Sequence, residues 1–471
     1  MRIQRTIPIL AAALAVACLA AGCSQSGGNP RSQSADEQVR RKWGKGLADL
    51  PTVTLVAISP HNEAIEKEFE WAFSAEHALA RGQAVAIEWR NVGGGSSSIE
   101  QYLLNIYERK DTAGIDVVWG GGEFTYYRLA SGNVLQPLAL SADVLANVPQ
   151  DFGGVQMYDK RKLWIGSAVS GFGFLYNKAL LERCGLTAPQ AWDDLARPEL
   201  ADLVALADPT QSGSAAAAYR MIVLSGRTWP EGWGKLLAIL SNAKRFVDSA
   251  GAAANAPLLG ESIVATSIDF YGALRVAVAP DQIVYVSPRG QTTFSPDPIA
   301  ILKNAPHPEL AARFVEFVMS PRGQALWALP AGAAGGPVRT ALGRQPIRRD
   351  VYRQYAGKLL PWIVDPYQAG QALQVGPDMQ KVDFGVLRLL VQAAALDNLQ
   401  DLRQARAALI RTRFRPDLVA EFNRLPENID DVEEMPAIVR QFKDKAQAER
   451  IVTDWQRFFR DKYRRIAEAS P

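Results

Sequence analysis

The feature that most constrains the fold is a unit that repeats between residues 52 and 130. In each copy an apolar strand pattern is followed by a turn of small residues and then by an amphipathic helix pattern. The strand patterns are residues 52–58 (TVTLVAI), 84–92 (AVAIEWRNV) and 114–119 (GIDVVW). Because strands joined through a helix lie parallel, with the helix on one face of the sheet, this order predicts an α/β fold.

A fourth unit of the same kind lies further along the chain. The apolar run 203–206 leads into ADPTQSGSAAAAY, residues 207–219, where small residues open a run of strong helix formers. In an open α/β sheet such turns gather beyond the carboxyl ends of the strands, and the first N–H groups of each helix have no intrahelical partner. The four turns therefore predict a cleft for a small anionic ligand.

The residues of these turns are the candidate ligand contacts. Glycine lets a ligand approach the backbone closely, and serine adds a hydroxyl group. Each turn alone is equally explained by ordinary helix capping; in the first turn, for example, Ser59 would be the cap and Pro60 the first helical residue. What favours a binding site is that all four turns occur directly after a strand. The candidates are Ser59, Gly94, Gly95, Gly121 and Gly122 in the first half, and Ser212, Gly213 and Ser214 in the second.

Little in the sequence supports catalysis or metal binding. The three histidines, His61, His77 and His307, form no HExxH pattern, and the chain has no GxSxG elbow. His77 and His307 lie in polar, surface-like stretches, and His61 is interpreted as a surface residue in the first turn of a helix. No CxxC or Cys/His cluster is present, so we expect neither a structural metal nor a cofactor, and the protein is predicted not to be an enzyme.

The N-terminus has the pattern of an export signal. MRIQR is positively charged, and the apolar run TIPILAAALAVACLA and the small residues AAGC follow it. This pattern predicts a lipoprotein signal peptide over residues 1–22, a lipid on Cys23, and a tether over residues 23–50. Ala20 stands where such signals usually carry Leu, so an ordinary signal peptide cut near Cys23 is the alternative. Both predict a periplasmic or extracellular protein.

Charge and cysteine content exclude two further classes. Loss of Arg2 and Arg5 with the signal lowers the formal charge from +3 to about +1, which gives no support for nucleic-acid binding. Cys18 would leave with the signal and Cys23 would carry lipid, so Cys184 remains alone and no disulfide framework is possible.

Four stretches resemble the periplasmic solute-binding components of ABC importers, and within them the group of ferric-iron-binding proteins with its relatives for phosphonates, sugar phosphates and thiamine. They are ADPTQSGSAAAAY, SGFGFLYNKALLERCGL, SGNVLQPL and HPELAARFVEFVMSPRGQALW. The likeness covers about residues 52–339. It implies a two-lobed periplasmic-binding-protein fold of type II that closes on one solute and presents it to an ABC permease and its ATPase. Lobe 1 is expected to span residues 51–137 and 281–344, and lobe 2 residues 138–280.

The same resemblance bears on the identity of the ligand. Iron-binding members use two adjacent tyrosines after a strand, whereas the matching stretch ATSIDFYGAL has Asp269 and Phe270 before a single Tyr271. Asp269 and Tyr271 could still bind ferric ion as hard oxygen ligands. The preferred ligand is an organic anion, such as a phosphorylated compound or a phosphonate, with its oxyanion at the 212–214 turn and Asp269 accepting from a ligand donor. Asp269 is equally well interpreted as a buried carboxylate that accepts hydrogen bonds from backbone N–H groups. Trp119 is either a wall on which a ligand stacks or a core residue.

Residues 345–471 are expected to form a helical C-terminal extension that such proteins usually lack. The stripe Trp455, Phe458, Phe459, Tyr463 and Ile466 predicts a core-facing helix there. Packing on one lobe is favoured over contact with a partner, because the apolar stripes need cover. A sensory receptor and an extracytoplasmic enzyme, with Asp269 and Tyr271 as its acid/base pair, are the alternatives to a transport receptor.

Overall fold

A computed structural model describes residues 30–93, 95–368 and 372–469. Its first half follows the repeating unit. β1 (Thr52–Ile58) pairs in parallel with β2 (Ala84–Arg90) and β3 (Val117–Trp119), and β3 pairs in antiparallel orientation with β12 (Phe294–Leu302). The predicted strands are therefore confirmed, in a sheet that is mixed rather than wholly parallel.

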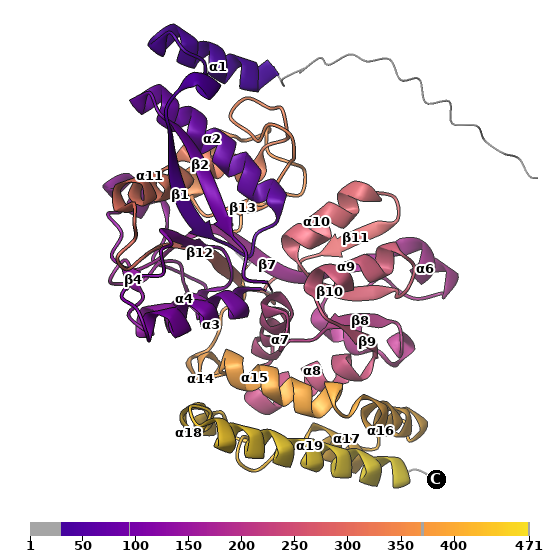
Figure 1. Cartoon of the computed structure of the whole chain (residues 1–471). Helices are drawn as coiled ribbons and strands as arrows, with labels where there is room; N and C mark the ends of the chain where they lie inside the picture. Colours follow the sequence, from indigo (N-terminus) through magenta and orange to yellow (C-terminus); the bar gives the residue numbers. More distant parts are fainter. Residues whose placement is uncertain (1–29, 94, 369–371, 470–471) are drawn as a thin grey trace, which may run out of the picture.

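The sheet continues into the second half through one long strand, β7 (Ile165–Asn177) (Figure 1). Its first part pairs with β12 and its second part with β10 (Val264–Ile268). All 13 residues of β7 are buried, and the strand passes through Gly171 unbroken. A Cβ on Gly171 would lie 2.9 Å from the Phe294 ring, so only glycine leaves room for that ring.

Beyond β10 the sheet ends with β8 (Val204–Ala207) and β9 (Ala243–Val247), both in parallel orientation, and β11 (Ile283–Val286) pairs with β7. The described residues form one 11-stranded sheet with the main order β2-β1-β3-β12-β7-β10-β8-β9. We call the β2-to-β12 half with its helices lobe 1, and the β10-to-β9 half lobe 2. The α/β two-lobed fold class is confirmed.

The buried clusters divide the chain differently from the expected boundaries. Leu138, Val144 and Met157 pack with lobe 1, so the chain enters lobe 2 within β7 and not at residue 138. β11 belongs to lobe 2 because it pairs with the second part of β7, so the chain returns after β11 and not at residue 281. The first boundary moves because the long strand β7 carries the chain into lobe 2, and the return runs through residues 287–293, between β11 and β12.

Helices cover both faces of the sheet. Residues 308–328 form two helices, because Ser320 caps the second and Pro321 cannot continue the first. Lobe 1 has α2 (Glu63–Arg81), α3 (Ser96–Tyr107), α4 (Glu123–Ser131), α5 (Ala142–Asn147), α11 (Pro308–Met319) and α12 (Pro321–Ala328), and lobe 2 has α6 (Lys178–Arg183), α7 (Gly213–Leu224), α8 (Trp229–Ser241), α9 (Ala250–Leu258) and α10 (Asp269–Val278).

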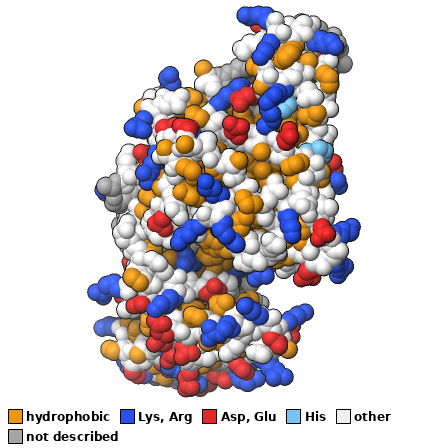
Figure 2. Space-filling view, turned by 90° about the vertical axis from the view of Figure 1, so that its left-hand side faces the viewer, with side chains coloured by type: hydrophobic (Ala, Val, Ile, Leu, Met, Phe, Trp, Pro, Cys, Tyr) orange, Lys and Arg blue, Asp and Glu red, His pale blue; other side chains and the backbone are white. Residues whose placement is uncertain are grey.

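The C-terminal extension begins on lobe 1 with β13 (Gln345–Pro346), which pairs with β7, and α13 (Arg349–Gln354). It then crosses to lobe 2 through α14 (Pro377–Gln380). The rest, here called the C-terminal helices, comprises α15 (Phe384–Val391), α16 (Leu399–Arg411), α17 (Pro416–Asn423), α18 (Met435–Gln441) and α19 (Lys445–Glu468). Figure 2 shows this part as a mass below the lobes, with acidic and basic side chains interspersed on its surface.

The C-terminal helices share one apolar core with lobe 2. The predicted stripe on α19 is confirmed: Trp455, Phe459, Tyr463 and Ile466 are buried, and Phe458 packs beside them. The ring of Phe459 lies 5.8 Å from that of Trp233 in α8 of lobe 2. The extension therefore packs on lobe 2, as its apolar residues require.

At the other end, α1 (Pro30–Trp43) occupies much of the predicted tether. Its Val39 is fully buried with Ala78 of α2 and Ala84 of β2, so this part of the segment is docked on lobe 1 and is not a free linker. Cys23 and the predicted signal peptide lie outside the described residues. Among the helices of residues 30–93, 95–368 and 372–469, none combines the length and the apolar character that crossing a membrane requires.

Candidate functional site

The helix starts that the sequence singled out are capped in different ways. Ser212 caps α7, accepting from the Ala215 N–H at 3.3 Å, and glycines precede α3 and α4. The prediction that Ser59 caps α2 was wrong: Asn62 accepts from the Ile65 N–H at 3.1 Å, so the helix begins after Asn62. The Ser59 hydroxyl oxygen instead accepts from the backbone N–H of His61 at 3.0 Å.

These starts lie close together in space. Gly120 and Gly121 have φ of 95° and 98°, which favours glycine. A Cβ on Gly120 would lie 2.7 Å from His61 Nε2, and one on Gly121 would lie 2.8 Å from Ser96 Cβ. A Cβ on Gly213 would lie 3.5 Å from Ser96 Oγ. The turns before α2, α3 and α4 in lobe 1 and the start of α7 in lobe 2 therefore meet at one place, which we call the lobe junction.

The other candidates around α3, α4 and α7 have varied exposure. Gly95 and Gly122 are exposed, and Gly121 is half-buried at the junction. Ser212 is 9% exposed, and its hydroxyl group caps α7. Ser214, two residues further along the chain, is half-buried. Gly94 lies outside the described residues. The backbone of the α7 start is thus better presented than the Ser212 hydroxyl.

Asp269 opens α10, at the carboxyl end of β10, on the same edge of lobe 2 as α7. Its carboxylate accepts from the backbone N–H groups of Gly171 at 2.8 Å and Phe270 at 2.7 Å. Burial raises the pKa of Asp269 to about 6, and the Gly171 N–H and the Arg344 charge act against that rise. Backbone groups therefore already use both of its oxygens.

Tyr271 follows in the same helix, with its ring 4.3 Å from that of Phe270 and under the Arg275 guanidinium. Within the part of the chain that the structure describes, no group of three or more His, Cys, Asp or Glu side chains is placed to hold a metal ion. Tyr126, of the only Tyr-Tyr pair, donates from its hydroxyl to the Pro298 carbonyl at 2.7 Å and is fully buried, in agreement with a packing role.

A buried ionic cluster beside the junction was missed from the sequence. His61 Nε2 lies 2.7 Å from Asp297 Oδ2 in β12, and Arg344 Nη1 donates to the same oxygen. Arg344 Nη2 donates to Ser170 Oγ of β7 at 3.1 Å, and its guanidinium lies over the Phe270 ring. Burial acts to raise the pKa of Asp297, but Arg344 and His61 together hold it below its usual value.

Two histidine interpretations and one open alternative are settled by burial. The surface interpretation of His61 was wrong, because its side chain is 6% exposed, and His77 is also buried. His307 is about half-exposed at its side chain and lies 3.0 Å from Asp116 through Nδ1. Trp119 is a core residue: it is fully buried, and its Nε1 donates to Ser167 Oγ at 2.8 Å.

The family is decided by comparison with known proteins. A family described as "Bacterial extracellular solute-binding protein" matches residues 96–341, which is more than half of the chain. The chain belongs to this family. A curated relative, the phosphoglycerate transport regulatory protein PgtC of Salmonella typhimurium, is 28% identical over 168 residues, which cover 36% of this chain and 41% of the relative. The match thus spans about two-fifths of that relative's length.

Solved structures share the fold of this solute-binding protein at low identity. The periplasmic binding protein AfuA from Actinobacillus pleuropneumoniae, with fructose-6-phosphate bound, has a TM-score of 0.55 and 18% identity, covering 77% of this chain and 99% of its own. Iron-bound HitA from Pseudomonas aeruginosa has a TM-score of 0.52 and 17% identity, covering 71% and 98%. At these identities the likeness shows a common fold.

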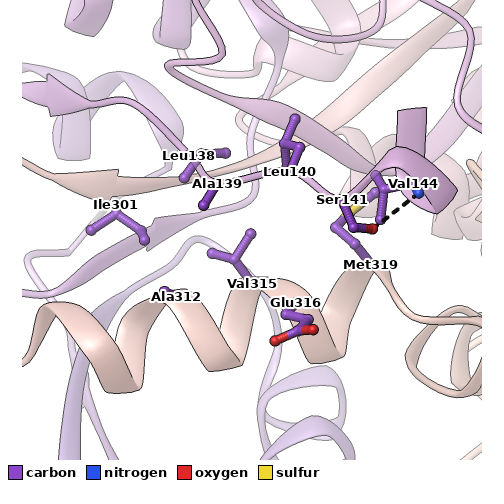
Figure 3. A pocket seen from close by; sticks show the side chains of 10 residues that line it. All are labelled: Leu138, Ala139, Leu140, Ser141, Val144, Ile301, Ala312, Val315, Glu316 and Met319. Carbon is purple, nitrogen blue, oxygen red and sulfur yellow. Dashed lines mark hydrogen bonds between the residues drawn. The ribbon is translucent and has the colours of Figure 1, made fainter.

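Two cavities of this solute-binding protein lie away from the lobe junction. One of about 40 Å³ lies between α11 and residues 138–144 (Figure 3), which is room for about one water molecule. The other, of about 540 Å³, is lined by α1, α2, α12 and residues 334–339. Both are confined to lobe 1 and its N-terminal helix, so closure of one lobe on the other would not enclose a solute in either.

Proposed function

We propose that this protein captures a small organic anion, phosphorylated or a phosphonate, between its two lobes and delivers it to the permease and ATPase of an ABC importer. In this proposal a lipid on Cys23 anchors the protein at the periplasmic or extracellular face of a membrane. Membership of the extracellular solute-binding family supports the transport role. Rotation of the lobes about the strands that join them, chiefly β7, is the means of capture.

The observation that carries this proposal is the meeting of helix starts from both lobes. Gly213 of lobe 2 faces Ser96 of lobe 1, and Gly121 lies against the same serine. Each helix start contributes N–H donors and a partial positive charge, worth about 0.3–1 kcal/mol toward an anion. An oxyanion held between such starts would stabilise the closed arrangement, because both lobes donate to one group.

The identity of the anion rests on charge and on similarity. Both oxygens of Asp269 already accept backbone N–H groups, which disfavours a ferric site built on Asp269 and Tyr271. Among proteins of this fold, AfuA holds fructose-6-phosphate, and the name of PgtC refers to phosphoglycerate transport. Ferric ion is the second candidate, supported by the fold shared with HitA and by the place of Asp269 and Tyr271 at the same edge as α7.

The first experiment identifies the solute. Mass spectrometry of material released from natively purified protein, with an iron assay on the same sample, separates the two candidates. Calorimetric titration then compares 3-phosphoglycerate, fructose 6-phosphate, inorganic phosphate and ferric citrate. We expect a phosphorylated compound to bind and to be recovered intact; turnover would point to the enzyme alternative. Iron in stoichiometric amount, with no organic anion, would overturn the proposal.

A pair of serine variants tests the place of binding. Ser212 and Ser141 are both helix caps with an oxygen-to-nitrogen distance of 3.3 Å, but Ser141 lies at the start of α5, away from the junction. Each serine-to-alanine change should cost about 1 kcal/mol of folding free energy. Only Ser212→Ala combined with Ser214→Ala should also weaken binding, by about tenfold. If Ser141→Ala and the double variant bind the solute with equal affinity, the anion does not bind at the α7 start.

The name of PgtC also supports a sensory role, in which the closed form is read by a signalling partner. Uptake of the labelled solute distinguishes the two roles. Transport requires that uptake be lost on deletion of this protein while the permease is still present. A sensor predicts that expression of the transporter changes and that constitutive expression restores uptake.

A further inference from the structure

Helix α15 lies beneath α7 and reaches across toward α4 of lobe 1 (Figure 1). The helix is capped by Asp383, and Val386, Leu387 and Leu390 are buried in the core shared with lobe 2. Phe384 and Arg388 lie four residues apart, so they share another face of the helix, and both are half-buried. One face of α15 is thus fixed to lobe 2 while a second face presents an aromatic ring and a guanidinium to the lobe junction.

Arg388 holds the turn that leads into α7. Its Nε donates to the Pro209 carbonyl at 2.7 Å, and its Nη2 donates to the Thr210 carbonyl. Asp208 ties the same turn from within, accepting from the Thr210 N–H and hydroxyl group at 2.7 Å each. Ser212, two residues after Thr210, is the cap of α7. The orientation of the α7 start is therefore fixed in part from the C-terminal extension.

The charge of Arg388 is also felt by both lobes. Burial lowers the pKa of Arg388, while the carboxylates of Glu100 in lobe 1 and Asp208 in lobe 2 act to raise it. Glu100 belongs to α3, the helix whose first residue, Ser96, faces Gly213. The Arg388 guanidinium is thus attracted by a carboxylate of α3 in lobe 1 and by one in the turn that leads into α7.

Phe384 makes the contact with lobe 1. Its ring stacks on that of Phe124, with centroids 4.3 Å apart and planes inclined by 11°. Phe124 is the second residue of α4, two residues after the exposed Gly122. On its other side the guanidinium of Arg220 in α7 lies 5.5 Å from the ring centre, and Arg220 Nε donates to the Val382 carbonyl at 3.0 Å. Because Phe384 is fixed to lobe 2 and Phe124 belongs to lobe 1, opening of the lobes must separate these rings.

We infer that α15 is a working part of the binding site: Arg388 positions the α7 start, and the Phe384–Phe124 pair fastens the closed lobes together. Helix α15 lies outside the residues that the family match covers, 96–341. The part concerning the anion rests on the proposed function, whereas the fastening of the lobes does not. Arg388 is a positioning residue, and Phe384 acts on the equilibrium between open and closed lobes.

Two matched control residues exist in the same C-terminal helices. Arg403 also donates from Nε and Nη2 to lobe 2 carbonyls, those of Ala243 and Lys244, but these belong to β9 and not to the junction. Phe414 lies between α16 and α17. Its ring is 38% exposed and lies beneath the guanidinium of Arg406. Arg403 and Phe414 thus match Arg388 and Phe384 in chemistry but have no part in the proposed contact between the lobes.

The first test needs no ligand. Hydrogen–deuterium exchange of the ligand-free full chain should show faster exchange over residues 122–126 and 209–216 in Phe384→Ala and Arg388→Ala, by about threefold to tenfold. Exchange over α19 should stay unchanged, which excludes general unfolding. Phe384→Tyr should restore the wild-type rates, and Arg388→Lys should restore them partly, since an ammonium cannot span both carbonyls. Equal effects of Arg403→Ala and Arg388→Ala, or of Phe414→Ala and Phe384→Ala, would overturn the inference.

The second test separates this inference from the proposed function. If 3-phosphoglycerate or fructose 6-phosphate binds the wild type, Arg388→Ala should weaken it about tenfold and Phe384→Ala about threefold, while Arg403→Ala and Phe414→Ala match the wild type. Phe384→Ala and Phe124→Ala should cost no more together than either alone. If none of the probes binds but the exchange differences hold, the solute assignment fails and the fastening of the lobes stands. If Phe384→Ala and Phe124→Ala weaken binding additively, the fastening of the lobes by this pair is contradicted.

Discussion

The lobe junction and the contact between lobe 2 and the C-terminal helices differ in what fills them. At the junction, glycines bring backbone turns together, and beside it His61, Asp297 and Arg344 are joined by hydrogen bonds. Beneath lobe 2, Trp233 packs on Phe459, and the buried cation Lys462 donates to two backbone carbonyls among aromatic rings. The backbone groups of the junction turns can exchange partners with water or a solute at small cost, whereas an apolar contact cannot separate without exposing its area. We therefore expect lobe 2 and the C-terminal helices to move as one body against lobe 1.

The apolar contact predicts the largest effect. Phe459→Ala should lower the free energy of unfolding by about 3–5 kcal/mol, because the ring is fully buried between α8 and α19. Urea unfolding measures the change, and Phe414→Ala, at a ring 38% exposed, should cost less than about 1 kcal/mol. Loss of exchange protection in α19 while α8 keeps its own would show that the two do not form one body.

Removal of the junction cation should rank next. Arg344→Met leaves the Asp297 carboxylate buried without its arginine partner, with the His61 ring still 2.7 Å away, and should cost about 3 kcal/mol in the same assay. Arg344→Met combined with Asp297→Asn should cost less than Arg344→Met alone, since no uncompensated charge remains. A double variant less stable than the single one would mean that hydrogen bonds, and not charge, hold the cluster.

The sequence predicted the sheet, the helix starts and the packing of the extension, because each depends on local pattern. The strand Thr52–Ile58 and the cap Ser212 could be predicted from the residues next to them in the sequence. The cluster of His61, Asp297 and Arg344 could not be predicted, since its members are 236 and 47 residues apart and each alone has an ordinary context. The misplacement of the α2 cap has the same origin: Ser59 and Asn62 both suit a cap, and only the geometry selects one.

A third effect concerns pH at the lobe junction. Burial raises the pKa of Glu123, at the start of α4, to about 7, against the opposing charge of Arg220. The folded state therefore holds this proton more tightly than the unfolded state, and the stability that it contributes is full below about pH 4.5 and is lost as the pH rises through about 7. Glu123→Gln should match the wild type near pH 4 and exceed it by on the order of 1–3 kcal/mol at pH 8. Thermal unfolding across this range measures the difference, and parallel curves would contradict it.

The smallest effect comes from the surface of the C-terminal helices and has the opposite sign. Hydrogen bonds from Arg424 and Arg465 lower the pKa of Glu421 to about 2, against a smaller effect of burial. Its contribution to stability is thus present above about pH 4.5 and is lost as the pH falls through about 2. Because solvent screens this pair, Glu421→Gln should cost at most about 1 kcal/mol at pH 7, and less in high salt. Glu449→Gln, at a more exposed pair with Lys445, is the control and should change nothing measurable. If Glu421→Gln were instead more stable than the wild type, and only above pH 7, the carboxylate would be titrating as a buried group, and the surface of the extension would resemble the lobe junction after all.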